Sequence, residues 1–366
     1  MRITIVIGGL GGGGAERVCV NLANAWAARA HEVTLLTIAM RSLGSVYPLD
    51  ARVARVDLGW PHAARPAIAA DLILRGLEDA GCPELAGEVE LMAVLRAGIL
   101  ETNPDVVVSH MDLTNVRVLA ALHGTQIPVI ACEHTDPTRV SLGAWDRARG
   151  ALYSRAHAVV ASHHATTGWL TRRGIAARTI ANALVPPTTT PTRNGRKHLI
   201  TLGRLAPEKR VDLLIRAFAR IADDLPEWDL DVYGDGPLRE ELTRAAQRVH
   251  GRVTIHGFTD EPYAALAGAD LYASASCIEG FGNAIWEALA CGVPVVAMDC
   301  GAPVRTLVHD GIDGRLVQGG EHALSVALAE LMGDDTARAR LAARAAEAKT
   351  RYALDTVLRE WDEVLA

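Results

Sequence analysis

Short apolar runs alternate along the whole chain with longer segments in which apolar residues recur at helical spacing. This alternation is typical of parallel β-sheets whose strands are joined by crossover helices. The apolar runs predict strands at Arg2–Ile7, Glu32–Ile38, Asp105–Ser109, Pro128–Cys132, Ala158–Ala161, His198–Leu202, Leu230–Tyr233, Val253–His256, Asp270–Ala273 and Pro294–Ala297. The segments of helical period predict helices that include Ala15–Ala30, Thr114–Leu122, Arg210–Ala222, Pro237–Val249, Asn283–Ala290, His322–Met332 and Leu354–Leu365. We therefore expect an α/β fold.

The predicted strands fall into two groups on either side of residues 185–196, where Pro, Thr and Gly cluster and neither period continues. We interpret this segment as a linker between an N-terminal domain, residues 1–184, and a C-terminal domain, residues 197–350. A last helix, within residues 351–366, is expected to cross back to the N-terminal domain. Two doubly wound, Rossmann-like domains bind ligands at the carboxyl ends of their strands, so we expect them to face an inter-domain cleft.

Composition narrows the function classes. The chain has 366 residues, which suits about two domains. The net charge of −6 gives no indication of a nucleic-acid partner. No apolar stretch approaches the roughly 18 residues of a membrane span, and the strand-like N-terminus is unlike a signal peptide. The 6 cysteines are scattered and form no C-x-x-C pair, so we expect a reduced, cytoplasmic protein without a metal site.

The first predicted strand leads into a glycine-rich loop. Gly8–Ala23 reads GGLGGGGAERVCVNLA and contains the pattern G-x-G-x-x-G. A nicotinamide-dependent oxidoreductase also needs an acidic residue about 20 positions further on, at the end of the second strand. That strand ends at Thr37–Arg41 without one, which disfavours this class. A glycine turn before a helix still presents backbone N–H groups to an anionic or polar ligand, and the alternative is a loop that binds nothing specific.

Two loops in the second half carry more specific chemistry. In the loop GRLAPEK, Arg204 and Lys209 follow a strand and offer a planar guanidinium and a compact ammonium to a diphosphate. In the loop EGFGNAIWE, Glu279 and Glu287 flank a Gly-Phe-Gly turn that begins a helix. Their carboxylates can accept hydrogen bonds from hydroxyls, and the N–H groups of the turn favour a phosphate or sugar oxygen. The alternatives are two solvated cations in the first loop and simple packing in the second.

These motifs resemble a known family. The spacing E-x₇-E of Glu279 and Glu287, the pattern G-R-L-x-x-x-K and the run E-A-L-A-C-G-V-P-V are together similar to the retaining glycosyltransferases of family 4, which have the GT-B fold. The segments YGDGPL and HGF fit that family in order and spacing. The resemblance covers nearly the whole chain and is most specific in residues 198–318. One departure is Asn182-Ala183, where the family often has an Asn-Gly turn, so Asn182 is left out of the predicted site.

The resemblance implies a role for each matching residue. Arg204 and Lys209 would hold the donor diphosphate and stabilise charge on the departing nucleoside diphosphate. Glu287 would bind the ribose, and Glu279 would bind hydroxyls of the donor sugar. His134 matches the histidine that lies near the donor sugar and the attacking acceptor. The remaining candidate donor contacts are Gly13, Gly14, Gly203, Gly257, Phe258, Gly280, Phe281, Gly282 and Asn283, and the candidate acceptor contacts are Glu16, Arg17 and Glu133.

The predicted reaction is the transfer of a hexose or N-acetylhexosamine from a nucleoside diphosphate sugar, preferably UDP-linked, to a hydroxyl of a soluble small molecule. The resemblance implies retention of configuration by attack on the face from which the leaving group departs, with a diphosphate oxygen accepting the proton. No cofactor or metal is expected besides the sugar nucleotide as co-substrate.

Other functions stay open. The first is the extension of a lipid-linked glycan at the inner membrane surface. Residues 61–101 disfavour binding to anionic lipid, because three arginines stand there against seven carboxylates. The second is a non-catalytic sugar-nucleotide-binding subunit. A nucleotide-sugar epimerase would need no acceptor, but the spacing of the two glutamates is not its hallmark.

Overall fold

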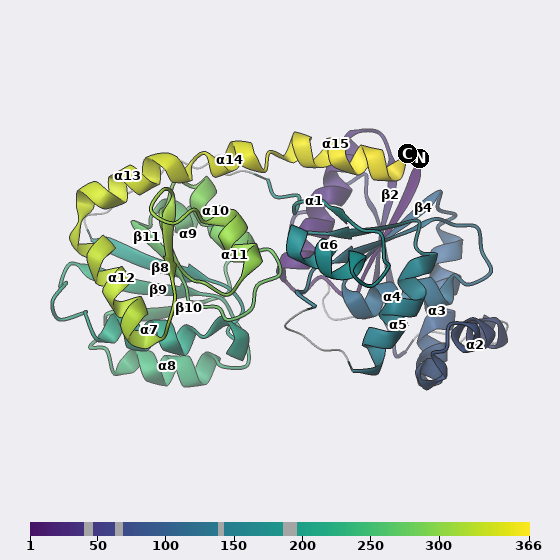
Figure 1. Cartoon of the computed structure of the whole chain (residues 1–366), viewed down its shortest axis with the longest axis horizontal. Coiled ribbons are helices and arrows are strands. Elements are labelled where there is room, and N and C mark those ends of the chain that lie inside the picture. Colours follow the sequence, from purple (N-terminus) through teal and green to yellow (C-terminus); the bar gives the residue numbers. More distant parts are fainter. Residues whose placement is uncertain (40–46, 63–68, 138–142, 186–195) are drawn as a thin grey trace. The chain divides into compact units, whose positions relative to one another are not determined.

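The computed structural model describes residues 1–39, 47–62, 69–137, 143–185 and 196–366. These residues divide into two compact units, and each is described by itself (Figure 1). The first unit comprises Met1–Leu184 together with Asp355–Ala366, and the second unit comprises Val185–Leu354. Residues 186–195 of the predicted linker lie outside the described residues.

The first unit is built on a parallel sheet with the strand order β3-β2-β1-β4-β5-β6-β7. Its strands are β1 (Arg2–Ile7), β2 (Glu32–Ala39), β3 (Ala54–Trp60), β4 (Val106–His110), β5 (Val129–Glu133), β6 (Ala158–Ala161) and β7 (Arg178–Thr179). Its helices are α1 (Gly14–Ala28), α2 (Ala70–Asp79), α3 (Val89–Glu101), α4 (Asp112–Ala121), α5 (Ala144–Leu152), α6 (His164–Thr171) and α15 (Leu354–Leu365), with short 3-10 helices η2 (Pro83–Glu88) and η3 (Tyr153–Arg155). Every residue of β4 and β5 is buried, as expected of strands covered on both faces.

Helix α15 packs against α1 within the first unit. The rings of Trp26 and Trp361 meet edge to face with their centroids 5.5 Å apart, and both side chains are buried. At the rim of this contact, Arg29 forms an ion pair with Asp362 at 2.9 Å. The two indoles bury a large apolar area, so this contact is a substantial part of the core of the first unit.

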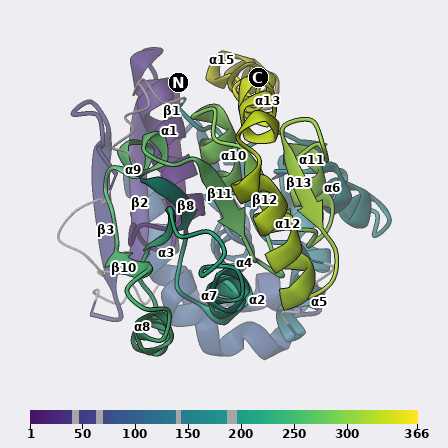
Figure 2. The same cartoon turned by 90° about the vertical axis from the view of Figure 1, so that its left-hand side faces the viewer.

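The second unit is built on a parallel sheet with the strand order β10-β9-β8-β11-β12-β13. Its strands are β8 (Lys197–Leu202), β9 (Trp228–Tyr233), β10 (Val253–Gly257), β11 (Leu271–Ser274), β12 (Val295–Met298) and β13 (Gly314–Val317). Its helices are α7 (Val211–Ala219), α8 (Arg239–Gln247), α9 (Pro262–Ala267), α10 (Asn283–Ala290), α11 (Ala302–Leu307), α12 (Glu321–Gly333), α13 (Asp335–Ala345) and α14 (Ala348–Arg351), with the 3-10 helix η4 (Pro207–Lys209). Helices α7 and α8 lie on one side of this sheet, and α9 and α10 lie on the other (Figures 1 and 2).

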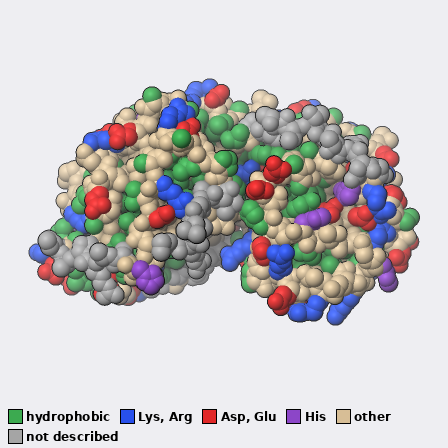
Figure 3. All heavy atoms as spheres, turned by 180° about the vertical axis from the view of Figure 1, so that it is seen from behind, with side chains coloured by type: hydrophobic (Ala, Val, Ile, Leu, Met, Phe, Trp, Pro, Cys, Tyr) green, Lys and Arg blue, Asp and Glu red, His purple; other side chains and the backbone are tan. Residues whose placement is uncertain are grey.

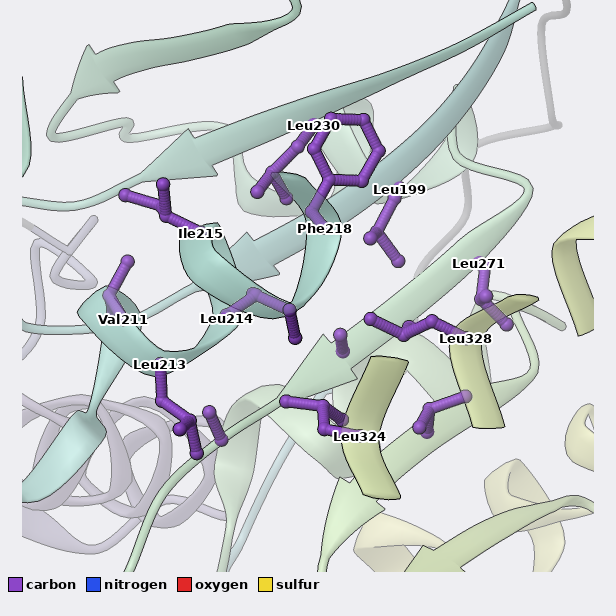
Figure 4. Packing of buried hydrophobic residues seen from close by; sticks show 14 of the residues in the cluster. Leu199, Val211, Leu213, Leu214, Ile215, Phe218, Leu230, Leu271, Leu324 and Leu328 are labelled. Atoms are coloured by element: carbon purple, nitrogen blue, oxygen red, sulfur yellow. The ribbon is translucent and has the colours of Figure 1, made fainter. Parts of the chain in front are cut away.

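The core of the second unit forms where α7 and α12 cover the sheet. The buried face of α7 presents Val211, Leu214 and Phe218, which recur at helical spacing. They pack with Leu199 of β8 and with further buried residues of β9, β11 and α12 (Figure 4). This packing fixes the strand ends from which the loops of the candidate site emerge.

The expected α/β fold with two Rossmann-like, GT-B units is confirmed, and each predicted strand overlaps a strand of the structure. The prediction missed β3, β7 and β13. In β3 the side chains are exposed or only half-buried and the apolar residues are interrupted by Arg55 and Asp57, so no continuous apolar run marks it. Strand β7 has 2 residues, which is too short for any period to show.

Among the described residues, no helix is long and apolar enough to cross a membrane. On the face in view in Figure 3, Lys and Arg side chains are interspersed with Asp and Glu side chains. This face therefore carries charges of both signs rather than a field of one sign.

Candidate functional site

Lys209 and Glu279 meet at the carboxyl end of the sheet of the second unit. Lys209 ends η4, shortly after β8, and Glu279 lies on the loop before α10. The Lys209 Nζ atom donates to Glu279 Oε1 at 2.7 Å, and the side chains are 26% and 11% exposed. The structure thus brings together the candidate diphosphate and sugar contacts of two separate motifs.

Three loops that follow β8, β9 and β10 are locked together by close backbone contacts. The N–H of Gly203 donates to the carbonyl of Tyr233 at 3.0 Å, and the N–H of Gly234 donates to the carbonyl of Gly257 at 2.7 Å. A Cβ atom on Gly234 would lie 1.8 Å from the carbonyl oxygen of Gly203. Only glycine fits at Gly234, and this fixes the backbone of the candidate donor contacts Gly203 and Gly257.

The loop before α10 is anchored by an aromatic contact. Phe281 is buried, and its ring meets that of Tyr352 edge to face with centroids 5.7 Å apart. The hydroxyl of Tyr352 donates to the carbonyl of Thr306 at 3.2 Å. Gly282, with φ 95°, is the N-cap of α10, and Asn283 is the first helical residue. The side chain of Phe281 is therefore an anchor, which leaves the backbone of the Glu279–Gly282 loop as the part able to meet a ligand.

Other predicted donor contacts differ in exposure. Phe258 is 48% exposed beside Gly257, whereas Glu287, on α10, is only 4% exposed. Arg204 is exposed, and within the described part of the chain its side chain forms no ion pair or hydrogen bond. An exposed guanidinium without an internal partner is available for a bidentate contact with a ligand.

A recess between the ends of β8 and β11 adjoins Lys209. Its lining includes Gly203, Lys209 and the hydroxyl-bearing side chains Thr201, Tyr233, Tyr272, Ser274 and Ser276, beside apolar residues such as Leu205 and Val232. Burial raises the pKa of Tyr272 far above its usual range, so its hydroxyl stays neutral. A cation, neutral hydroxyls and backbone N–H groups at the carboxyl ends of parallel strands suit phosphate and sugar oxygens.

In the first unit, Glu16 occupies the N–H groups of the glycine-rich loop. Its carboxylate accepts from the N–H of Gly13 at 2.6 Å, which is the half of a capping box that a glycine N-cap allows at the start of α1. Burial raises the pKa of Glu16, against the effect of these backbone N–H groups. Arg17 lies over the ring of Tyr47, 5.4 Å from its centroid. Glu16, a candidate acceptor contact, is thus already engaged, and a ligand at Gly13 or Gly14 would compete with it.

Glu133, the last residue of β5, belongs to a buried polar network. The hydroxyl of Tyr153 donates to Glu133 Oε1 at 2.5 Å, and Arg149 Nη1 lies 3.5 Å from the same oxygen. Neither side chain of the Glu133–Arg149 pair is more than 1% exposed. Burial raises the pKa of Glu133 to about 7, although the charge of Arg149 opposes this. The predicted contact of Glu133 with an acceptor is therefore not accessible within this unit, and the residue supports the end of β5 instead.

His134 follows Glu133 directly and pairs with a second histidine. The Nε2 atom of His134 lies 2.8 Å from the Nδ1 atom of His110, the last residue of β4. Burial lowers the pKa of His134 to about 4 and that of His110 well below its usual range. Both rings line a recess with Ser162, Asn182 and Trp361.

Sequence reasoning missed several of these contributors. His110 carries no motif, but it directly follows the predicted strand Asp105–Ser109 and is the last residue of β4 in the structure. Tyr352 lies far from any motif, and nothing in the sequence signals its contact with the loop before α10. Asn182 was set aside because of the altered turn, yet it lines the recess with His134.

Comparison with known proteins gives two family models that match successive parts of the chain. The model described as "Glycosyl transferase 4-like domain" matches residues 13–187, and that described as "Glycosyl transferases group 1" matches residues 196–334. Together they span the larger part of both units.

Individual relatives match to different extents. An exopolysaccharide phosphotransferase of Streptomyces coelicolor is 34% identical over 172 residues, which are 46% of this chain and only 18% of that relative. A GalNAc-alpha-(1->4)-GalNAc-alpha-(1->3)-diNAcBac-PP-undecaprenol alpha-1,4-N-acetyl-D-galactosaminyltransferase of Campylobacter jejuni is 24% identical over 371 residues, covering 100% of this chain and 98% of the relative.

A solved structure of the pneumococcal O-GlcNAc transferase GtfA, in complex with UDP and GlcNAc, superposes with a TM-score of 0.78 at 14% identity. The match covers 100% of this chain and 98% of that one, and it concerns the fold. The two family models and the relative that matches along its whole length show that the chain belongs to the glycosyltransferase superfamily, with the GT-B fold.

Proposed function

We propose that the protein is a retaining, metal-independent glycosyltransferase that moves a hexose or N-acetylhexosamine from a UDP-sugar to a hydroxyl of an acceptor. The observation that carries this proposal is the contact of Lys209 with Glu279 at the carboxyl end of the sheet, with Arg204 exposed on the same loop as Lys209. The choice of UDP is supported by the similar fold of GtfA, whose structure was solved with UDP and GlcNAc.

In the proposed reaction, Arg204 and Lys209 stabilise the negative charge that develops on the departing UDP. The diphosphate draws Lys209 toward itself, and Glu279 then accepts hydrogen bonds from the hydroxyls of the donor sugar. The acceptor oxygen forms its bond to the anomeric carbon on the face from which UDP leaves, and a diphosphate oxygen takes the acceptor proton. Positioning and electrostatic stabilisation supply the rate enhancement, and no carboxylate needs to act as nucleophile.

For the acceptor, we propose first a sugar hydroxyl of a lipid-linked glycan. The support is the Campylobacter jejuni relative, whose name describes such a glycan and which matches along its whole length. The second candidate is the soluble small molecule expected from the sequence. It is supported by the segment containing α2 and α3, which is rich in carboxylates that would repel anionic lipid. None of the six cysteines forms a disulfide, which supports our proposal of a reducing, cytoplasmic location.

A thermal-shift panel tests the donor. UDP, UDP-glucose, UDP-GlcNAc, UDP-GalNAc, GDP-mannose and NAD would each be added with and without EDTA. A ligand at about 100 times its dissociation constant adds about 2.7 kcal/mol to the free energy of unfolding, enough to rank the panel. We expect UDP compounds to give the largest shift and EDTA to leave it unchanged. A larger shift with NAD than with any sugar nucleotide would contradict the proposal.

Product analysis tests transfer. The preferred UDP-sugar would be incubated with an undecaprenyl diphosphate glycan or with free oligosaccharides, and the anomeric configuration of the product read by NMR. We expect an α-linked product from an α-linked donor, on the lipid-linked glycan. Transfer to free oligosaccharides alone would favour the second acceptor class. Donor binding without transfer or slow hydrolysis would indicate a non-catalytic subunit and refute the enzymatic proposal.

A further inference from the structure

Two histidines of the first unit, the buried His110 and the half-buried His134, are joined edge to edge. His110 ends β4, and its register partner Cys132 lies two residues before His134 on the neighbouring strand β5. The Nδ1 atom of His110 and the Nε2 atom of His134 are 2.8 Å apart, the ring centroids are 5.1 Å apart, and the ring planes differ by 26°. The centroid separation exceeds the nitrogen–nitrogen distance by about twice the distance from an imidazole centroid to its ring nitrogen. Both nitrogens therefore lie nearly on the line between the two centroids. One ring therefore donates its N–H to the lone pair of the other, nearly in plane.

Two arrangements of the protons satisfy this contact. Both rings are neutral near pH 7, because burial lowers the pKa of each, and a neutral imidazole carries one N–H. Either His110 donates from Nδ1, or His134 donates from Nε2. The second arrangement would place the N–H of His110 on its Nε2 atom, which is buried and has no hydrogen-bond partner among the described residues. A buried N–H without an acceptor is rarer and more costly than an unused lone pair, and this favours donation by His110.

We propose that His110 is a positioning residue that donates its Nδ1–H to His134 and thereby holds His134 as the Nδ1–H tautomer. A free histidine side chain prefers the Nε2–H tautomer, so the contact with His110 reverses the natural preference of His134. The Nδ1 atom of His134 forms no hydrogen bond with any residue in the described ranges, but unlike His110 Nε2 it is not sealed from solvent, so an N–H there is not left without an acceptor. His134 thus presents an N–H donor, and not a lone pair, to a ligand.

This inference rests on the proposed function and deepens it. A donor at His134 recognises an oxygen lone pair of a ligand, such as that of a hydroxyl or of a phosphate group. The same ring cannot accept the proton of the attacking hydroxyl while its second nitrogen already accepts from His110. His134 therefore acts by hydrogen bonding alone and does not take the proton of the acceptor.

Two variants of His110 separate the donor from the bulk of the ring. In His110→Asn, the side-chain amide places an N–H group where Nδ1 stood. In His110→Leu, a side chain without a donor fills the space. Long-range ¹H–¹⁵N spectra would report the tautomer of His134 in the full chain, with its signals assigned by their loss in His134→Gln.

We expect the Nδ1–H pattern for His134 in the wild type and in His110→Asn, and the Nε2–H pattern in His110→Leu. With a UDP-sugar and acceptor, we expect kcat to fall at least about tenfold in His110→Leu and to recover in His110→Asn, with the KM for donor little changed. An Nε2–H pattern in the wild type would overturn the proposal, even if the leucine variant failed to fold. The spectra need no turnover, so they remain decisive if the protein proves not to be a transferase.

Discussion

Replacing Glu133 by glutamine should change how the stability of the first unit depends on pH. The carboxyl group of Glu133 is buried with Tyr153 and Arg149, and burial raises its pKa from 4.5 to about 7. The folded protein therefore holds a proton on Glu133 that the unfolded chain releases at lower pH. Glutamine is neutral at every pH and has nearly the same shape as the protonated acid.

The sign and size follow from linkage. A carboxyl group with a raised pKa contributes stability that is complete below pH 4.5, declines as the pH rises and is gone above about pH 7. At about 1.36 kcal/mol for each pH unit, this loss is about 3 kcal/mol for wild type. The glutamine variant has no such loss. Relative to wild type, Glu133→Gln should therefore gain about 3 kcal/mol in the free energy of unfolding between pH 4.5 and pH 8.

Urea unfolding at several pH values, followed by tryptophan fluorescence, would measure this difference for the transition of the first unit. The comparison between variants at each pH cancels the contributions of the other titrating groups, including His134. Glu101→Gln, at an exposed glutamate of the same unit, serves as the matched control for the exchange of glutamate by glutamine. A difference for Glu133→Gln that stays constant within about 0.5 kcal/mol over this range would refute the reasoning.

Three further predictions concern the second unit. Lys209→Ala should weaken UDP binding by roughly 10- to 100-fold, because a charge-assisted contact is lost, whereas Lys349→Ala should leave titration calorimetry unchanged. Gly234→Ala should destabilise by roughly 3 kcal/mol or more, because a left-handed backbone and a backbone clash combine. Gly311→Ala, with φ 74° and open space around it, should cost only about 1–2 kcal/mol, and equal losses in urea unfolding would argue against the clash. Tyr352→Leu should raise the KM for donor several-fold by loosening the loop before α10. An unchanged KM would show that Tyr352 does not anchor this loop for donor binding.

The parts of the fold that the sequence predicts are those in which local pattern and burial agree. Buried central strands such as β4 and β5 appear as apolar runs, and α10 has the bounds that its helical period predicts, Asn283–Ala290. The sequence pattern did not predict the edge strand β3, because only the central strands of a parallel sheet are apolar on both faces. The contact of Glu16 with the N–H of Gly13 is local in the sequence, but the prediction for Glu16 rests on the family resemblance and gives it a contact with the acceptor instead.

The candidate site divides in the same way. Lys209 and Glu279 stand in recognisable motifs, and their predicted proximity follows from the rule that loops meet at the carboxyl edge. Their roles toward a donor stay predictions. His110 and Gly234 were beyond local reasoning, because the first depends on the register of β4 with β5 and the second on the approach of the Gly203 carbonyl from another loop. Each of these contacts joins two separate segments, so the sequence of one segment alone does not indicate it.

The packing of Trp361 on Trp26 has a consequence for the order of folding during synthesis. Residues of the first unit lie on both sides of the second unit in the sequence, because Asp355–Ala366 rejoins Met1–Leu184. During synthesis on the ribosome, all residues of the second unit emerge before α15. Until α15 emerges, the first unit lacks Trp361, and the indole of Trp26 stays uncovered. The unit that is begun first is therefore completed last, and until then an apolar surface on α1 is open to chaperones.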